Sequence, residues 1–284
     1  MQILRKLFAL PTQAAVSNPL WLKSNMCHQA QQASDVFQAW VPRIREHPGH
    51  MHRKVWEFCY IAQALSERGL LSPGKRGLGF AVGQEPLTAL FADSGCEILA
   101  TDLGTAEASK GGWVETAQHA DSLDALNKRG ICIPDVFQRQ VRFRSVDMRE
   151  LPDDLGSFDF IWSSCSLEHL GSLALGEKFV FESLKYLVPG GWAVHTTEYN
   201  LSSDSATVSE GHTVLFRKRD IQRIAKHLRR LGHHIELDFT EGRLPADQVI
   251  DQPPYTHQVH LKLSMLGHIV TSFGLIIRKA GSAT

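Results

Sequence analysis

Two aspartates end apolar strands at a spacing that suits a nucleoside. Gly83 lies in the turn "GFAVGQE", and Asp102 closes the strand "CEILATDL" nineteen residues later. An acid about 20 residues beyond a glycine turn, at the tip of the adjacent strand, accepts hydrogen bonds from both hydroxyls of a ribose. Asp147 in "VDMRELP" ends the next strand, where its carboxylate can accept the exocyclic amine of an adenine beside the apolar face of Met148. The sequence therefore predicts an adenosine site.

The turn that would hold this ligand has an incomplete glycine pattern. The stretch "GKRGLGFAVGQEPL" places Gly79, Ala81, Gly83 and Glu85 two residues apart. Gly83 can take a positive φ or let the backbone approach a ligand, and the helix expected to begin near Pro86 offers its N-terminus. A glycine turn between strand and helix also occurs without any ligand. The two aspartates favour the interpretation as a cofactor site.

An alternation of strands and helices must position these residues. The apolar strands are expected at 76–82, 96–101, 141–146, 158–163 and 191–197. The helices between them are expected near 85–94, 115–129 and 175–187. Such alternation predicts right-handed crossovers and an α/β fold with a parallel, doubly wound sheet.

Two regions of different character divide the chain. Residues 1–74 carry helical spacing without strand-like alternation, which predicts a helical N-terminal segment acting as a lid or substrate cap. Residues 75–284 are expected to form a Rossmann-like domain with a substrate-side insertion near 240–262.

The segments "FDFIWSSCSLEHL" and "LKYLVPGGWAVHTTE", together with the turn and the two aspartates, resemble the class I S-adenosylmethionine-dependent methyltransferases over about residues 75–200. The closing "HIELDF" and "HIVTSFGLIIRK" are similar to the end of that family's sheet, where strand seven inserts between strands five and six. The resemblance implies a seven-stranded sheet, S-adenosylmethionine as cofactor and methyl transfer as the reaction.

The family turn reads acid-x-Gly-x-Gly-x-Gly, so Gly79 stands at the acid position, Ala81 at the first glycine and Glu85 at the third. Ala81 is expected to cost little if its φ stays negative. The resemblance implies that the cofactor is bound by Gly79, Ala81, Gly83, Glu85, Asp102, Leu103, Asp147, Met148, Ser163 and Ser164.

Methyl transfer to a hydroxyl needs a group that takes the hydroxyl proton. The candidates are His169, Glu168, Glu198 and His257. His169 is placed first, because a histidine near its ordinary pKa of ~6.5 is a base at neutral pH. Glu168 and His169 are equally compatible with tying their loop to the backbone, and His195 is expected to be a core histidine.

The loop "DQVIDQPPYTHQVHLKL" gathers Asp251, Tyr255, His257 and His260 before the last strand. Its polar and aromatic side chains suit a sugar or polyol, so we expect a wall of the acceptor pocket. No metal site is predicted, because Pro253 and Pro254 prevent a helix that would place the two histidines on one face. The expected function is O-methylation of a small-molecule or carbohydrate acceptor in small-molecule biosynthesis.

The composition limits the classes of partner and the location that we expect for this protein. The 30 basic and 30 acidic residues cancel, which argues against nucleic acid. Five scattered cysteines predict no disulfide framework, no segment approaches the ~20 apolar residues of a membrane span, and Pro11 interrupts the weak signal-like start, so a cytoplasmic location is expected. A homodimer is possible. A nicotinamide-dependent oxidoreductase and a catalytically inactive methyltransferase-like partner subunit remain alternatives.

Overall fold

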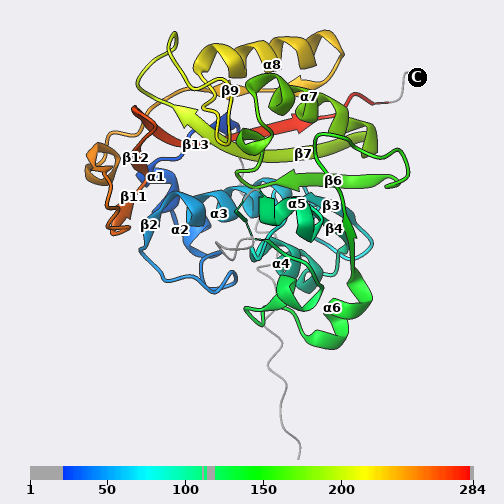
Figure 1. The fold of residues 1–284 in the computed structure, drawn as a ribbon. Helices are drawn as coiled ribbons and strands as arrows, with labels where there is room; N and C mark the ends of the chain where they lie inside the picture. Colours follow the sequence, from blue (N-terminus) through cyan, green and yellow to red (C-terminus); the bar gives the residue numbers. More distant parts are fainter. Residues whose placement is uncertain (1–21, 111, 114–118, 282–284) are drawn as a thin grey trace, which may run out of the picture.

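A computed structural model describes residues 22–110, 112–113 and 119–281 (Figure 1). The signal-like start and residues 114–118 of the expected helix at 115–129 lie outside the described residues. Within them, no helix is long and apolar enough to cross a bilayer.

A mostly parallel sheet forms the centre of the molecule. Among the described residues it has nine strands, in the order β10-β12-β13-β7-β6-β3-β4-β5, with β8 also paired to β13. The strands are β3 (Arg76–Phe80), β4 (Glu97–Asp102), β5 (Val141–Ser145), β6 (Phe158–Ser163), β7 (Leu187–Asn200), β8 (His234–Ile235), β10 (Ile250–Asp251), β12 (Lys262–Met265) and β13 (His268–Arg278).

The expected seven strands are all present, and β10 and β12 are short additions at one edge. The last expected pair is confirmed, because β13 lies antiparallel between β7 and β8. The resulting order reverses at β3, whose neighbours are β4 and β6. Ligands of open α/β sheets bind at such a switch point, beyond the carboxyl ends of the strands.

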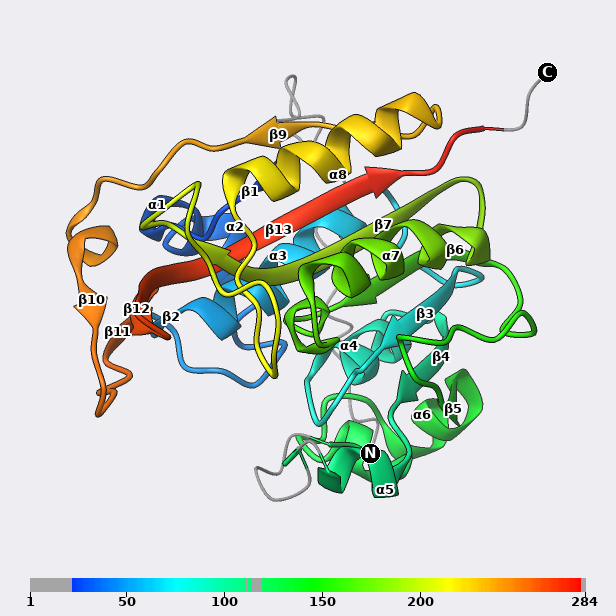
Figure 2. The ribbon, with the colours of Figure 1, turned by 45° about the horizontal axis from the view of Figure 1, so that its top comes forward.

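Helices cover both faces of the sheet (Figure 2). One face carries α7 and α8, and the other carries α3 and α4. The helices are α1 (Gln29–Gln32), α2 (Asp35–Gln38), α3 (Arg53–Ser66), α4 (Leu87–Asp93), α5 (Thr105–Lys110), α6 (Pro134–Gln140), α7 (Leu173–Ser183) and α8 (Lys218–Arg230). The expected helix at 115–129 is wrong in its described part, which holds only a 3-10 turn at Asp124–Asn127.

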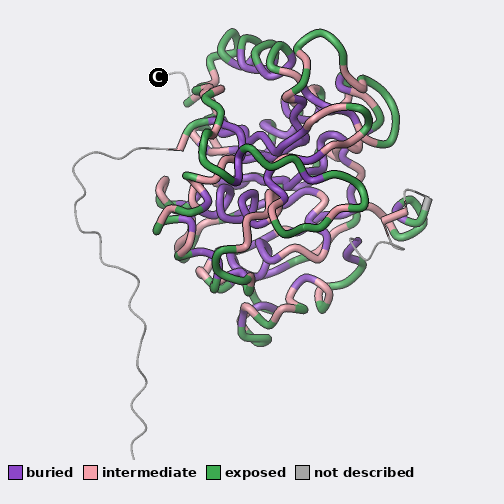
Figure 3. The backbone as a smooth tube through the Cα atoms, turned by 90° about the vertical axis from the view of Figure 1, so that its left-hand side faces the viewer, coloured by how far each residue is buried: buried purple, intermediate pink, exposed green. Residues whose placement is uncertain are grey.

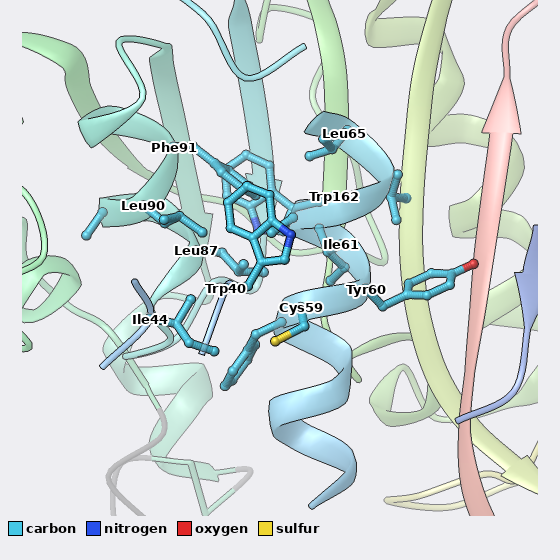
Figure 4. Packing of buried hydrophobic residues seen from close by; sticks show 14 of the residues in the cluster. Trp40, Ile44, Cys59, Tyr60, Ile61, Leu65, Leu87, Leu90, Phe91 and Trp162 are labelled. Carbon is cyan, nitrogen blue, oxygen red and sulfur yellow. The ribbon is translucent and has the colours of Figure 1, made fainter. Parts of the chain in front are cut away.

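The N-terminal segment is built into the core. Ten of the fourteen residues of α3 are buried, and they pack between α4 and the strands β7 and β13 (Figure 4). Short parallel ladders join this segment to the end of the chain: β1 (Ser24–Asn25) pairs with β9 (Leu237–Asp238), and β2 (Met51–His52) with β11 (Val259–His260). Figure 3 shows the buried centre that results. The predicted cap is therefore a layer of the domain, and side chains between Glu46 and Phe58 reach the site described below.

Candidate active site

A cavity of about 890 Å³ opens at the carboxyl ends of β3, β4, β5 and β6. Its volume lies within the roughly 300–1,000 Å³ typical of small-molecule sites. Its walls come from the segment 46–58, the turn after β3, the region that follows β4, the end of β5 and the loop after β6, with His212 from a later loop. Most predicted cofactor residues meet here, namely Ala81, Gly83, Glu85, Asp102, Leu103, Asp147, Met148 and Ser164.

Asp102 is buried in the cavity wall and holds the loops around it. Its Oδ2 accepts hydrogen bonds from the amides of Gly83 (3.0 Å) and Ala120 (3.2 Å), and its Oδ1 accepts that of Leu103 (2.8 Å). A carboxylate has roughly four acceptor positions. Room therefore remains for about one further hydrogen bond, which corrects the expectation that Asp102 binds both ribose hydroxyls.

The turn after β3 departs from expectation at Ala81. This residue has φ +46°, a left-handed conformation that costs a non-glycine residue roughly 1–2 kcal/mol. The expectation of a negative φ at Ala81 is wrong. Gly83 also has a positive φ, of +52°, which a glycine adopts without such a penalty.

Gly79 lies in β3 behind the cavity and does not line it. The neighbouring strand places Trp162 opposite Gly79, and a Cβ on Gly79 would meet the indole at 2.4 Å. The position of the family's acid is therefore filled by an aromatic ring, and a direct contact of Gly79 with the cofactor is corrected to a packing role.

Glu85 is the carboxylate nearest to that missing acid in the turn. Its Oε1 lies 3.3 Å from Lys54 Nζ at the start of α3, and both residues line the cavity. Burial raises the pKa of Glu85 to about 7, against the effect of Lys54. A cation and an acid thus stand side by side on one wall.

Asp147 and Met148 occupy the end of β5 as predicted. Arg149 donates to both carboxylate oxygens of Asp147, at 3.0 Å from Nε, and this pair holds the pKa of Asp147 low although burial acts in the opposite direction. Met148 is buried beside Val146 on the same wall. An adenine amine would therefore share the Asp147 carboxylate with Arg149.

The loop after β6 corrects one predicted contact. Ser163 is fully buried away from the cavity, and its hydroxyl is 2.8 Å from His195 Nδ1, so both belong to the core. The next three residues, Ser164, Cys165 and Ser166, line the cavity instead. Among the described residues, Ser166 Oγ is buried without a hydrogen-bond partner, which identifies it as a polar atom available to a ligand.

A buried charge cluster at the start of α3 was missed by the sequence analysis. Glu57 is fully buried, with Lys54 Nζ at 3.1 Å and Arg53 Nη1 at 3.3 Å, and it accepts hydrogen bonds from Ser164 (3.1 Å) and Ser272 (2.5 Å). Burial opposes its ionisation, but the two cations hold the pKa of Glu57 at about 2. The sequence signal that could have revealed this cluster is in "HRKVWEF", where charged residues occur on a helix whose other faces are almost wholly apolar.

His169 is the predicted base that lines the cavity. Its Nδ1 donates to the carbonyl of His212 (3.0 Å), so Nε2 is the free acceptor of the neutral ring. Trp113 packs edge-on against it, with ring centroids 4.6 Å apart. Burial lowers the pKa of His169 to about 4, which corrects the expected value near 6.5. Trp113 lies in a turn after α5.

Glu168 and Glu198 lie behind the cavity wall and are almost fully buried. Glu168 Oε2 accepts from Thr197 (3.0 Å), while Oε1 is 3.9 Å from His169 Nε2. Glu198 Oε1 is 2.5 Å from Arg53 Nη2. Burial raises the pKa of Glu198 to about 7 in spite of Arg53, and Glu168 adds to the effect. Neither carboxylate lines the cavity, and Glu168 is the one that lies beside His169.

His257 is exposed and does not line the cavity, in contrast to its predicted catalytic position. Its loop reaches the cavity through neighbours: the His257 carbonyl is 3.1 Å from His50 Nε2, and its ring stacks on His52. His50 and His52 line the wall on this side.

Comparison with known proteins agrees with this arrangement. The family described as "Methyltransferase domain" matches residues 78–195, which include β3 through most of β7. No curated protein sequence is a significant match.

Three solved structures are among those to which this chain is similar. The [4+2]-cyclase SpnF is 16% identical, with a TM-score of 0.51, and the match covers 92% of this chain and 100% of that one. The glycopeptide N-methyltransferase MtfA is 15% identical, with a TM-score of 0.46 and coverage of 79% and 90%. Magnesium protoporphyrin IX methyltransferase from Synechocystis PCC 6803, solved with bound SAH, is 13% identical, with a TM-score of 0.45 and coverage of 88% and 97%.

The matched family and the strand order that reverses at β3 agree with each other and with the cavity at that point. Residues 78–195 thus form a methyltransferase domain with the strand order of the class I S-adenosylmethionine-dependent enzymes, which transfer a methyl group from that cofactor to an acceptor.

Proposed function

We propose that this methyltransferase methylates a hydroxyl group of a small polar acceptor such as a sugar or polyol. The observation that carries the proposal is that one cavity joins the two aspartates of the cofactor end to His169, whose Nε2 is free to accept a proton. When bound, S-adenosylmethionine supplies an electrophilic methyl group on a sulfonium.

Residues at the cofactor end fit that ligand by their chemistry. Asp102 offers its remaining acceptor position to the ribose, and Asp147 accepts the adenine amine beside Met148. Lys54 and Glu85 form a cation and acid pair suited to an amino-acid carboxylate and ammonium, and the unpartnered Ser166 hydroxyl adds a donor. Glu85 and Lys54 would thus replace the acid that Gly79 does not supply.

At the acceptor end His169 is the proposed general base. During transfer the sulfonium carbon–sulfur bond would break as the acceptor oxygen takes the methyl group, leaving a neutral thioether. The hydroxyl proton would pass to His169 Nε2, while Nδ1 keeps its bond to the His212 carbonyl. The Glu168 carboxylate, 3.9 Å away, would stabilise the ring once it is protonated. The Thr197 hydroxyl, which donates to Glu168 Oε2 at 3.0 Å, positions that carboxylate from behind.

The remaining wall suits an acceptor with several hydroxyls. It combines aromatic rings, Trp113 and Phe58, with polar side chains, His50, Glu46 and Arg129. Apolar faces with a few well-placed polar groups fix the orientation of small ligands. The side chains of residues 22–66 in this wall support a role in acceptor binding for the N-terminal segment.

A methyl-transfer assay with labelled cofactor tests the proposal. Matched panels of sugars and polyols, amines, and thiols would be compared under identical conditions, and the labelled product identified by mass spectrometry. We expect turnover with hydroxyl acceptors alone. Transfer restricted to amines would reject O-methylation while leaving the cofactor assignments in place.

A further inference from the structure

Three histidine rings meet beside the cavity, at the junction of the N-terminal segment and the loop before β12. His52, His257 and His260 each offer a ring nitrogen, and these nitrogens lie within 4.8 Å of one another. The ladder between β2 and β11 sets His52 directly opposite His260. Their ring centroids are 4.7 Å apart, and those of His257 and His260 are 4.6 Å apart.

A buried carboxylate orients the innermost ring. His260 Nδ1 donates to Asp251 Oδ2 at 2.7 Å, which leaves Nε2 as an acceptor. The same oxygen accepts the amide of His257 (3.0 Å), so Asp251 positions two of the three histidines. A carboxylate behind a histidine in this way is the usual second partner of a metal-ligating imidazole.

The three side chains differ in burial: His260 is buried, His52 is partly exposed and His257 is exposed. Metal ligation requires the neutral imidazole. The backbone of His257 has φ +58°, a conformation that non-glycine residues keep mainly where a site demands it.

We propose that His52, His257 and His260 bind one divalent transition-metal ion of the zinc type. Imidazole nitrogen suits zinc, cobalt and nickel, and three protein ligands leave a fourth position open. The prolines that argue against a helical site do not prevent this one, because its ligands come from β2, β11 and the loop before β11 rather than from one helix.

Binding requires a modest rearrangement. Ligand nitrogens of a tetrahedral zinc ion at 2.0–2.1 Å lie about 3.3 Å apart, so the exposed His257 ring must move inward. His52 Nδ1 accepts the amide of Lys54 at 3.1 Å, so ligation through Nε2 moves the ring proton to Nδ1 and gives up that bond. Because His52 lines the cavity, the open position would suit an oxygen of the acceptor, a step that rests on the proposed function.

Calorimetric titration of the full, untagged and chelator-treated chain with Zn²⁺ tests the site. We expect one ion per chain, with affinity at least tenfold weaker in His257→Ala and in His260→Ala and unchanged in the control His234→Ala, an exposed histidine on β8. Asp251→Asn should weaken binding roughly 10–100-fold. Co²⁺ should give the visible absorption of a tetrahedral site in the unmodified chain alone.

Binding of S-adenosylhomocysteine by the same variants separates the outcomes. Retained cofactor binding shows that the variants are folded and that the methyltransferase assignment stands. If such variants bind Zn²⁺ as tightly as the unmodified chain, or if the unmodified chain binds none, the metal proposal is overturned.

Discussion

The indole of Trp162 occupies the place of a side chain at Gly79. A Cβ built on Gly79 would lie 2.4 Å from Trp162 Cζ2, and the two residues are paired across β3 and β6. Phe91 of α4 packs edge-on against the same indole, with centroids 4.9 Å apart, and limits its movement (Figure 4). The space that a side chain at position 79 would need is therefore filled by Trp162.

Gly79→Ala should lower the free energy of unfolding by about 1–3 kcal/mol, the usual cost of overpacking a core. Urea denaturation would measure it. Gly281→Ala is the matched control, because a Cβ there meets no atom within 4 Å. In a Trp162→Leu background the Gly79→Ala cost should shrink to the part that comes from Val82, whose Cγ1 would lie 2.5 Å from the added Cβ. An equal cost in both backgrounds would exclude the clash with the indole as its cause.

Ala81→Gly should raise the free energy of unfolding by up to about 1 kcal/mol. Glycine removes the left-handed penalty at φ +46°, and its greater freedom in the unfolded chain offsets part of the gain. The control is Ala89→Gly within α4, which should destabilise by about 1 kcal/mol. A loss of stability in Ala81→Gly would show that the turn is not strained.

Asp102→Ala should weaken binding of S-adenosylhomocysteine at least tenfold. It removes the remaining acceptor position for the ribose, and hydrogen bonds to charged groups contribute about 1.5–3 kcal/mol. It also releases the amides of Gly83, Leu103 and Ala120, so thermal stability should fall as well. Calorimetric titration with S-adenosylhomocysteine would measure the affinity, with Asp121→Ala, an exposed residue nearby, as the control. Unchanged affinity in Asp102→Ala would remove this residue from the cofactor site.

The sequence predicted the strands well because their apolar runs are regular and their ends carry the functional residues. Asp102, Asp147 and His169 lie where that reasoning put them, at strand ends or in the loop that follows. The conformation of Ala81 and the burial of Ser163 depend on neighbours from other strands and were not readable from local pattern.

The charged start of α3 shows the same limit. Arg53, Lys54 and Glu57 are distant in sequence from Glu198 and Ser272, and only packing of α3 on the sheet brings them together. Likewise the three-histidine cluster exists because β2 pairs with β11, a contact between segments about two hundred residues apart that no spacing rule predicts.

Glu198→Gln should flatten the dependence of stability on pH. The pKa of Glu198 is raised to about 7 in the folded chain from an ordinary 4.5, so its contribution is full below pH 4.5 and is lost as the pH rises towards 7. For a buried group, a pKa shift of this size corresponds to a decrease on the order of 3 kcal/mol in the free energy of unfolding. Denaturation at pH 5 and pH 8 checks it, with the exposed Glu210→Gln as control. An unaltered slope in Glu198→Gln would show that Arg53 keeps this carboxylate ionised throughout.

His169→Gln should lower kcat by about 10²–10⁴-fold while leaving affinity for S-adenosylhomocysteine nearly intact, because the ring accepts a proton only during transfer. Since the pKa of His169 is lowered to about 4, the ring is neutral above that pH and loses its acceptor nitrogen as the pH falls through it. The pH profile of kcat/KM for the unmodified enzyme should therefore show no acidic limb that comes from His169 between pH 5 and pH 8. The control variant His234→Gln should have the same kcat as the unmodified enzyme. An acidic limb near pH 7 that persists in His169→Gln and disappears in Glu198→Gln would instead assign the base to Glu198, whose pKa is about 7.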